Sequence, residues 1–338
     1  MNKLSIEKRT QILGMLVEGN SLRAVSRMAD CSINTVTKLL VDVGTACAEY
    51  QDTHLRNLTC NQIQCDEIWA FCGMKEKNVS EEHKGELGYG DVYTWTALDR
   101  DTKMMVSFLV GRRDYEYAEA FISDLADRLS NRVQLTTDGH KAYLSAVEEA
   151  FGGDIDFAQL VKIYGPVPTK ERRRYSPAGF TGAEKTVVTG NPDIGKVSTS
   201  HVERQNLTMR MGMRRFTRLT NGFSKKVENL AHAVALHFMY YNFGRIHKTL
   251  RVTPAMEAGI ADHVWTLAGI AALVEEDAPK ARGPYKKKNS NCDTTSPSIR
   301  LTLSGLGGSI SVRIGYRART PTSPVGFRTF SNGALARR

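Results

Sequence analysis

The sequence predicts an α/β fold, in which a mixed five-stranded sheet with flanking helices is preceded by an all-α helix-turn-helix domain. Three observations predict it. Apolar residues recur at helical spacing over residues 5–43. From residue 61 on, apolar segments have the length of β-strands, and segments of helical pattern separate the later ones. The chain has 338 residues, of which 41% are hydrophobic, so it can bury the cores of one or two such domains.

Residues 1–50 carry the pattern of a helix-turn-helix. Ser21 and Ser32 stand where they can cap the second and third helices. The third helix would lie in the major groove of DNA. Its outer face is polar, and the predicted DNA-binding residues on it are Asn34, Thr35, Thr37 and Lys38. The alternative for this region is a plain helical bundle used for packing or dimerisation.

Residues 60–250 carry the predicted sheet. Strands are expected over residues 62–71, 92–98 and 103–110, and the last two form a hairpin. A helix over 115–129, a short strand over 133–137, a helix over 140–150 and a strand over 158–164 follow, and a long helix starts near Ser200. Further helices are expected over 224–244, from Thr253-Pro254 and over 262–273, so that residues 251–276 form a helical C-terminal extension.

The net charge of +10 is unevenly distributed. Residues 277–338 hold 12 basic and 2 acidic residues in a segment rich in Gly, Ser, Thr and Pro, which predicts a basic, disordered tail. Because the composition of this tail differs from that of the rest of the chain, the tail could come from an altered reading frame. Codon usage that stays the same across codon 288 of the gene would refute that hypothesis. Residues 162–226 hold 14 basic and 4 acidic residues, a pattern that suggests a surface for a polyanion. The alternative for that stretch is a solvated charged face.

Several classes of protein are excluded by the same sequence. It has no secretory apolar region at its N-terminus and no run of 18 apolar residues, so we expect a cytoplasmic, nucleoid-associated protein of bacterial type without a membrane partner. The six cysteines include no CxxC pair. The spacing of Cys60, Cys65 and Cys72 with His83 fits no familiar zinc site, so buried thiols are expected.

Three carboxylates fall where this topology can bring them together. Asp66 lies midway in the first strand, Asp138 at the end of the fourth, and Glu203 in the first turn of the long helix. If the first and fourth strands are neighbours, the two aspartates meet at one edge and the helix can add the glutamate. Such hard oxygen ligands suit two Mg²⁺ ions, with Mn²⁺ as a substitute, and two metals can activate the attacking oxygen and stabilise the leaving oxygen in phosphodiester chemistry.

Each acid also has an alternative role. Asp138 can be a turn residue in Asp-Gly, and Glu203 can close a capping box that begins at Ser200. Asp66 is harder to explain in this way, because an unpaired acid in an apolar strand is costly to bury. His140 and His201, each two residues from one of these acids, could contact phosphate there or merely cover a helix start.

A basic ridge follows Glu203 along its helix. Residues at i+3, i+7 and i+11 place an amide and two guanidinium groups on the stripe of the acid, and Arg215 and Arg218 continue it. The predicted DNA contacts on this ridge are Asn206, Arg210, Arg214 and Arg215. The alternative is a solvated helix face that makes surface ion pairs.

The stretches HVERQNLTMRMGMRRF and TNGFSKKVENLAHAVALHFMYYNF, within residues 201–243, resemble the catalytic region of transposases of the IS1 insertion-sequence family. QCDEIWAF and LTTDGHKAY look like the two Asp motifs of that family. The resemblance implies an RNase H-like domain over residues 60–250 with a DDE triad on Asp66, Asp138 and Glu203. Members of the family often carry paired cysteines in an N-terminal zinc ribbon. This chain has none, so DNA recognition falls to the helix-turn-helix.

The sequence therefore predicts a DNA transposase of an insertion sequence. It would bind the terminal repeats of the element through residues 1–50 and catalyse metal-dependent cleavage and strand transfer into target DNA. Joining two ends to one target predicts a homo-oligomer. One alternative is an RNase H-like, structure-specific nuclease without strand transfer. Another is a helix-turn-helix regulator whose second domain only dimerises or senses a ligand.

Overall fold

The computed structural model describes residues 4–165, 180–217 and 221–274. The predicted tail over 277–338 lies outside the described residues, as do parts of the basic stretch 162–226. Because of this, the predictions for that tail stay predictions.

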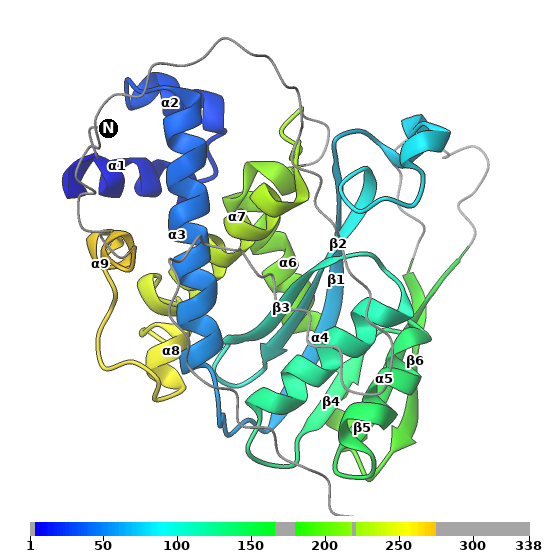
Figure 1. The fold of residues 1–338 in the computed structure, drawn as a ribbon. Helices are drawn as coiled ribbons and strands as arrows, with labels where there is room; N and C mark the ends of the chain where they lie inside the picture. Colours follow the sequence, from blue (N-terminus) through cyan, green and yellow to red (C-terminus); the bar gives the residue numbers. More distant parts are fainter. Residues whose placement is uncertain (1–3, 166–179, 218–220, 275–338) are drawn as a thin grey trace, which may run out of the picture. The chain divides into compact units, whose positions relative to one another are not determined.

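The centre of the fold is one mixed sheet of six strands in the order β3-β2-β1-β4-β5-β6 (Figure 1). β1 pairs in antiparallel fashion with β2, and β2 with β3, while β4 pairs in parallel with β1 and β5. The first and fourth strands are thus neighbours, which is the condition for the two aspartates to meet. The strands are β1 (Gln62–Cys72), β2 (Gly90–Asp99), β3 (Met105–Gly111), β4 (Gln134–Thr137), β5 (Asp156–Tyr164) and β6 (Phe180–Thr189).

The expected number of five strands was wrong, because β6 adds an antiparallel edge strand to β5. Almost all residues of β6 are exposed or half-buried on both faces. A strand that buries neither face shows no alternation of apolar and polar residues, and alternation is the signal by which a strand is recognised. Its stability comes from pairing with β5, which the sequence around it does not reveal.

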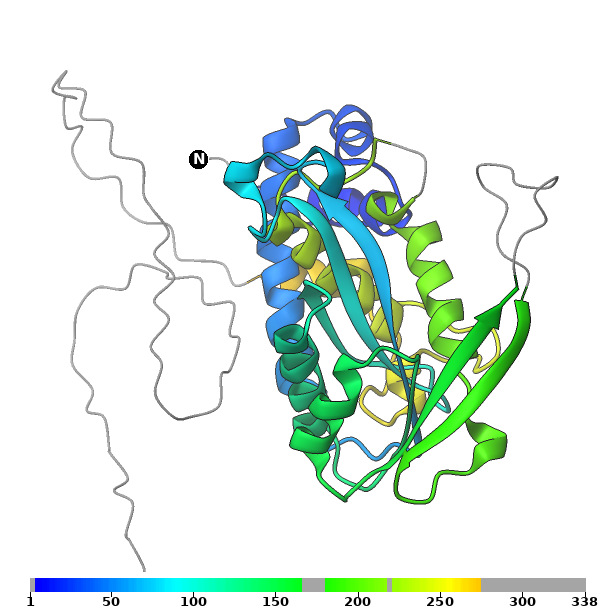
Figure 2. The same cartoon turned by 90° about the vertical axis from the view of Figure 1, so that its right-hand side faces the viewer.

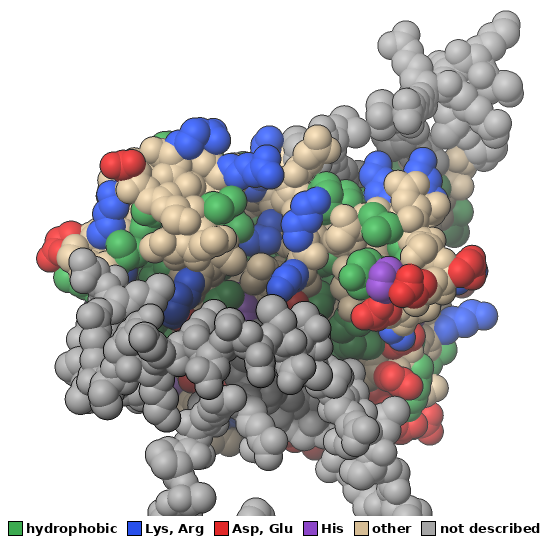
Figure 3. Space-filling view, turned by 45° about the horizontal axis from the view of Figure 1, so that its top comes forward, with side chains coloured by type: hydrophobic (Ala, Val, Ile, Leu, Met, Phe, Trp, Pro, Cys, Tyr) green, Lys and Arg blue, Asp and Glu red, His purple; other side chains and the backbone are tan. Residues whose placement is uncertain are grey.

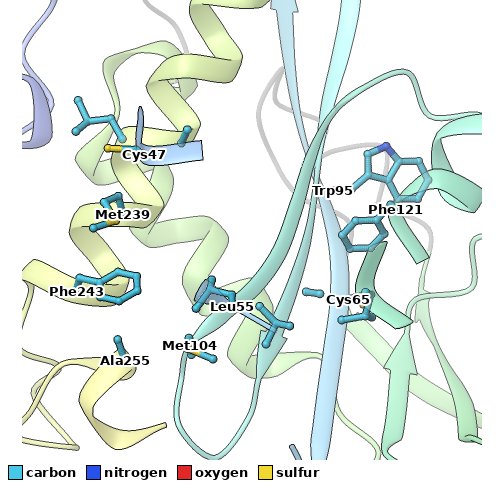
Figure 4. Packing of buried hydrophobic residues seen from close by; sticks show 14 of the residues in the cluster. Cys47, Leu55, Cys65, Trp95, Met104, Phe121, Met239, Phe243 and Ala255 are labelled. Carbon is cyan, nitrogen blue, oxygen red and sulfur yellow. The ribbon is translucent and has the colours of Figure 1, made fainter. Parts of the chain in front are cut away.

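Helices cover both faces of the sheet. α4 (Tyr115–Arg128) and α5 (Ala142–Phe151) lie on one face, and α6 (Ser200–Gly212) lies on the other, as Figure 2 shows from the side. The faces alternate along β1, as the pleat of a strand requires. Cys65 packs in the cluster of Trp95 and Phe121 (Figure 4), whereas Ile68 packs with Val202 of α6.

The N-terminal helices are α1 (Ile6–Val17), α2 (Leu22–Met28) and α3 (Ile33–His54). The predicted caps form, since the Ser21 and Ser32 hydroxyls accept hydrogen bonds from the Ala24 and Asn34 amides at 3.1 and 3.2 Å. α3 continues well beyond residue 43, where its apolar pattern was expected to stop. The helices are as expected, while a separate DNA-binding domain at residues 1–50 stays a prediction.

The extra length of α3 packs against α7 (Val227–Met239). At Gly44 the two helices are so close that an added Cβ would lie 2.5 Å from Cβ of His232. Further along, the Gln51 amide donates to the Ala235 carbonyl at 3.1 Å. The hydrophobic core therefore runs without a break from the N-terminal helices to the sheet.

The remaining described elements are short. α7 continues as a π-helix over Tyr240–Gly244, α8 (Pro254–Glu257) begins after Thr253 as expected, and α9 (Leu267–Ala272) begins later than residue 262 because Thr266 caps it. Turns of 3₁₀ helix occur at Glu76–Asn78, Glu81–His83, Ile194–Lys196 and Arg214–Phe216. Among the described helices, none has the length and apolar character needed to cross a membrane.

Candidate active site

The register of β1 and β4 brings two aspartates together. The ladder between these strands ends at the pair Gln64 and Thr136. Asp66 and Asp138 each follow two residues later, and side chains two residues apart in a strand share a face. The carboxylates of Asp66 and Asp138 therefore lie side by side where β4 ends, as the topology argument expected.

A turn fixes Asp138 in this position. Its Oδ1 accepts a hydrogen bond from the His140 amide at 2.9 Å, and its backbone carbonyl accepts one from the Gln159 side-chain amide at 3.0 Å. Asp138 is thus a turn residue, and it is also a neighbour of Asp66. The two roles that the sequence offered for it are compatible.

The sequence analysis missed Glu67. Carboxylate oxygens of Asp66, Glu67 and Asp138 all lie within 4.8 Å of one another, and this is the one such group of three or more His, Cys, Asp or Glu found among the described residues. Asp66 and Glu67 are adjacent in a strand, so they reach Asp138 from opposite faces of the sheet. The signal that could have found it is the Asp-Glu pair itself, inside an apolar strand.

Arg113 joins two of these acids. Its guanidinium donates to Glu67 Oε2 at 3.1 Å and to Asp138 Oδ2 at 3.3 Å. The Glu67 side chain is only 2% exposed, so the arginine compensates a charge that has left water. Arg113 therefore holds Glu67 and Asp138 in a fixed relation to each other.

Burial and like charges both act on the acids of this cluster. Burial, followed by the charges of Asp138 and Glu203, raises the pKa of Asp66 to about 6, although hydrogen bonds from the Glu67 amide and Asn206 oppose the shift. Burial and the charge of Asp138 raise the pKa of Glu67 to about 7, although Tyr143 and Arg113 oppose the shift. Carboxylates that crowd in this way are stabilised by a cation, and their hard oxygen atoms fit a divalent one. Asp66, Glu67 and Asp138 are the residues that could hold it.

Glu203 approaches from α6. Gln64, on the same face of β1 as Asp66, accepts hydrogen bonds from the His201 and Val202 amides at 2.9 and 3.2 Å, which seats the first turn of α6 on the sheet. The capping box from Ser200 does not form, because the N-cap is Thr199. Instead the Glu203 carboxylate accepts hydrogen bonds from the Thr199 hydroxyl and the Lys162 ammonium.

Asn206 lies one turn further along α6 and is almost fully buried. Its Nδ2 donates to Asp66 Oδ2 at 2.8 Å, while the Glu67 amide donates to Asp66 Oδ1 at 2.9 Å. Both oxygens of Asp66 are therefore oriented by the protein. The residue that the sequence placed among the DNA contacts touches a site carboxylate instead.

The arginines of the ridge lie farther from the acids. Arg214 is exposed just after α6, and Arg215 donates to the Ser224 hydroxyl. Both line a cavity of about 710 Å³ together with Arg23, Lys225 and Ile33, the first residue of α3. The basic end of α6 and the start of α3 thus border the same cavity. Lys and Arg side chains are numerous on the face of the molecule seen in Figure 3.

The histidines and cysteines that the sequence singled out lie in different places. His201 faces a second, basic pocket, whereas His140 adjoins Asp138 and has its pKa lowered by burial and by Arg113. Cys60, Cys65 and Cys72 are buried free thiols, and the described residues contain no metal-ligating group that includes them. That these cysteines form no zinc site stays a prediction.

Comparisons with known proteins bear on the same region. Residues 87–163, which run from the start of β2 to β5 and include Asp138, match the family model DDE_Tnp_IS240, described as a DDE domain. A search of curated proteins finds no match. Among solved structures, the "Cryo-EM structure of piggyBac transposase synaptic complex with hairpin DNA" is similar with a TM-score of 0.35 and 10% identity, over 81% of this chain and 72% of that chain. The family match supports an enzyme of the DDE transposase type but does not confirm the IS1 family.

Proposed function

We propose that this chain is the DNA transposase of an insertion sequence of the IS1 family, and that Asp66, Asp138 and Glu203 are its catalytic acids. The observation that carries the proposal is the meeting of Asp66 and Asp138 at the end of β4, inside a sheet whose β2–β5 region matches a DDE domain. The proposed cofactor is a pair of Mg²⁺ ions, for which Mn²⁺ can substitute. The ions supply Lewis-acid stabilisation of the attacking and leaving oxygens of a phosphodiester.

Residues around the acids have positioning roles in this proposal. Asn206 and the Glu67 amide each hold one oxygen of Asp66, and Arg113 holds Asp138. Partners of this kind orient ligand carboxylates before the metal binds. We therefore assign Asn206 to the orientation of Asp66 and not to contact with DNA.

The chemistry proceeds as two in-line displacements at phosphorus. Water cleaves a phosphodiester at the element end and leaves a 3′-hydroxyl, and that hydroxyl then attacks a phosphodiester of target DNA. Each step exchanges one P–O bond for another. The protein forms no covalent intermediate, so the triad needs only acids and no nucleophilic side chain.

DNA would be held along the surface from α3 to the end of α6. Asn34 and Lys38 are exposed on α3, with Thr35 and Thr37 half-buried beside them. Arg214 and Arg215 line the same cavity as Ile33, and Arg210 precedes them on α6. In this proposal the α3 residues contact the terminal repeat, and the arginines bind the backbone without regard to sequence.

The assembly and cellular place of the protein follow from the same chemistry. Two element ends must be joined to one target, so we propose a homo-oligomer. Its substrate would be chromosomal DNA, which corresponds to a cytoplasmic, nucleoid-associated enzyme. Size measurement of the protein with and without terminal-repeat DNA tests the oligomer.

Cleavage and joining of a labelled terminal-repeat duplex tests the function. The duplex is incubated with Mg²⁺ or Mn²⁺ and the wild type, Asp138→Asn, or Glu148→Gln, an exposed acid on α5 that serves as the matched control. We expect joined products from the wild type and the control, and DNA binding without products from Asp138→Asn. Metal-dependent cutting without joining would favour the structure-specific nuclease. Binding without any reaction under either metal would favour the regulator.

A further inference from the structure

A second, strongly basic pocket lies at the other end of β1 from the acids. Its volume is about 740 Å³, and it is lined by the start of β1, the β2–β3 turn, the start of β4 and the first turn of α6. The basic residues of its lining are Arg100, Lys103, Arg132, Lys196 and His201. The proposed catalytic chemistry makes no use of them.

Part of this charge is already compensated. Arg132 pairs with Asp156 at 2.8 Å, and Lys196 lies 3.5 Å from a carboxylate oxygen of Asp193. Arg100 instead donates to the Gln62 side-chain carbonyl, and Lys103 donates to the Arg100 backbone carbonyl. Within the described ranges, neither Arg100 nor Lys103 forms an ion pair. They are the cations with capacity for an external anion.

Two acids stand close to these cations: Asp99, and Asp101, which itself lines the pocket. The Asp99 carboxylate accepts a hydrogen bond from the Thr102 hydroxyl at 2.6 Å, and the Asp101 carboxylate accepts one from the Asn61 side chain at 3.0 Å. The lining therefore holds two acids, Asp101 and Asp156, against four lysine and arginine side chains.

The backbone shows that Lys103 is held in place. Its φ is +61°, a left-handed conformation that residues with a Cβ rarely adopt. Holding a lysine there costs of order 1 kcal/mol, which the surrounding structure must offset. The β2–β3 turn therefore presents Lys103 at the pocket at the expense of local backbone energy.

The pocket is separate from the acids but lies on the same face of β1. Gln62 lines the pocket, Gln64 seats the first turn of α6, and Asp66 carries the site carboxylate. At about 3.3 Å per residue, Gln62 and Asp66 are about 13 Å apart along the strand. Because α6 rests on Gln64 between them, a phosphate in the pocket is not the phosphate that reacts at Asp66.

We propose that this pocket binds the phosphodiester backbone of DNA away from the reacting phosphate, through Arg100 and Lys103. The proposal rests on the proposed function, since DNA is the substrate there. An open, polar pocket with unpaired cations fits the repeated charges of a backbone, and such binding is salt-sensitive and independent of sequence. It lies at the N-terminal end of α6, opposite to the arginines at the C-terminal end of that helix.

Salt-dependent binding tests the pocket. The affinity of the full chain for a labelled duplex is measured by fluorescence anisotropy at several salt concentrations in EDTA, so that no cleavage occurs. For Arg100→Gln/Lys103→Gln we expect the slope of log K against log salt to become shallower by about 1–2, since each lost phosphate contact removes about 0.9. The matched control Lys77→Gln/Lys84→Gln removes the same charge from the exposed 3₁₀ turns, and its slope should equal that of the wild type.

If the salt slope of the double variant equals that of the control, the proposal that this pocket binds DNA is overturned, while the proposed function stays intact. Failure of the wild type to bind any duplex would instead count against the proposed function. If the double variant misfolds, acetylation of Lys103 in the native protein decides. Protection by duplex DNA supports the proposal, whereas equal protection by inorganic phosphate alone would indicate a site for free phosphate and overturn it.

Discussion

The two ends of one face of β1 gather charges of opposite sign and hold them differently. Around Asp66, carboxylate oxygens of three half-buried acids lie within 4.8 Å of one another. Around Gln62, the cations line an open pocket of about 740 Å³. In both places burial and then like charges shift pKa values in the direction that opposes ionisation. Compact buried acids suit a small cation and spaced open cations suit an extended polyanion, so the geometry separates the two ligands that the charges call for.

The largest effect is expected at the acidic end, where two residues compete for the third position of the triad. We expect Glu203→Gln to reduce cleavage by about 10³-fold or more, because removing a metal ligand costs several kcal/mol of transition-state stabilisation. The measurement is single-turnover cleavage of the terminal-repeat duplex at saturating Mn²⁺. Glu148→Gln serves as the control.

The same assay on Glu67→Gln sharpens this comparison. Glu67 already pairs with Arg113, so Glu67→Gln should reduce cleavage less than Glu203→Gln does. If Glu203→Gln retains activity and Glu67→Gln loses it, the acidic site is completed from the α4 and α5 face of the sheet, and the assignment of Glu203 is wrong.

A smaller effect is expected from the residue that orients Asp66. Replacing Asn206 by Leu removes the 2.8 Å hydrogen bond to Asp66 Oδ2, and the loss of such a partner typically costs about 10–100-fold in metal affinity or activity. Mn²⁺ titration of the activity measures this, with Leu207→Ala on the exposed side of α6 as the control. Weakened DNA affinity with unchanged metal dependence would contradict the positioning role and restore the DNA contact that the sequence predicted.

Metal affinity should depend on pH in a defined window. The pKa values of Asp66 and Glu67 are raised to about 6 and about 7, so protons compete with the metal there. As the pH falls from 8 to 5, we expect Mn²⁺ affinity to fall by about tenfold per pH unit once a ligand carboxylate is mostly protonated, because a carboxylate ligand must be ionised to bind. Calorimetric titration across that range measures it. A constant affinity down to pH 5 would show that these acids titrate normally.

The smallest effect concerns the stability of the metal-free protein. The pKa of Asp66 is about 6 in the folded chain and near 3.8 in the unfolded chain, so the ionised carboxylate destabilises the fold above pH 6 and this cost disappears as the pH falls toward 3.8. Asp66→Asn should therefore raise the free energy of unfolding at pH 8 by about 1–3 kcal/mol and by much less at pH 4. Urea denaturation in EDTA at both pH values measures the difference. Equal stability of the two chains at pH 8 would refute the strain attributed to the acidic end.

Much of the acidic end could be predicted from the sequence because local signals and topology agreed. An acid in an apolar strand, an Asp-Gly turn after a short strand and a glutamate at a helix start are all visible as patterns, and the adjacency of β1 and β4 connects them. Glu67 was missed because its burial depends on Arg113, 46 residues away in the chain. β6 was missed because an exposed edge strand carries no alternation.

The basic pocket could be predicted from the sequence even less than Glu67 or β6. Arg100, Lys103 and His201 come from two elements about 100 residues apart, and no spacing in the sequence relates them. His201 was placed near the acids because it precedes Glu203 by two residues, yet two residues on a helix turn a side chain to another face. Only the seating of α6 on Gln64 directs Glu203 to one side and His201 to the other.

The sequence by itself determined the strands and helices that bury an apolar face, their caps, and the three acids of the proposed triad, because each depends on neighbours along the chain. The tertiary structure alone decided which carboxylates bring their oxygen atoms close together and which amide orients Asp66. It also decided which cations have no carboxylate partner among the described residues. These are properties of packing between segments far apart in sequence. Burial and Coulomb forces act through space, so the charges at the two ends of β1 acquire their chemical character only when the sheet and α6 are assembled.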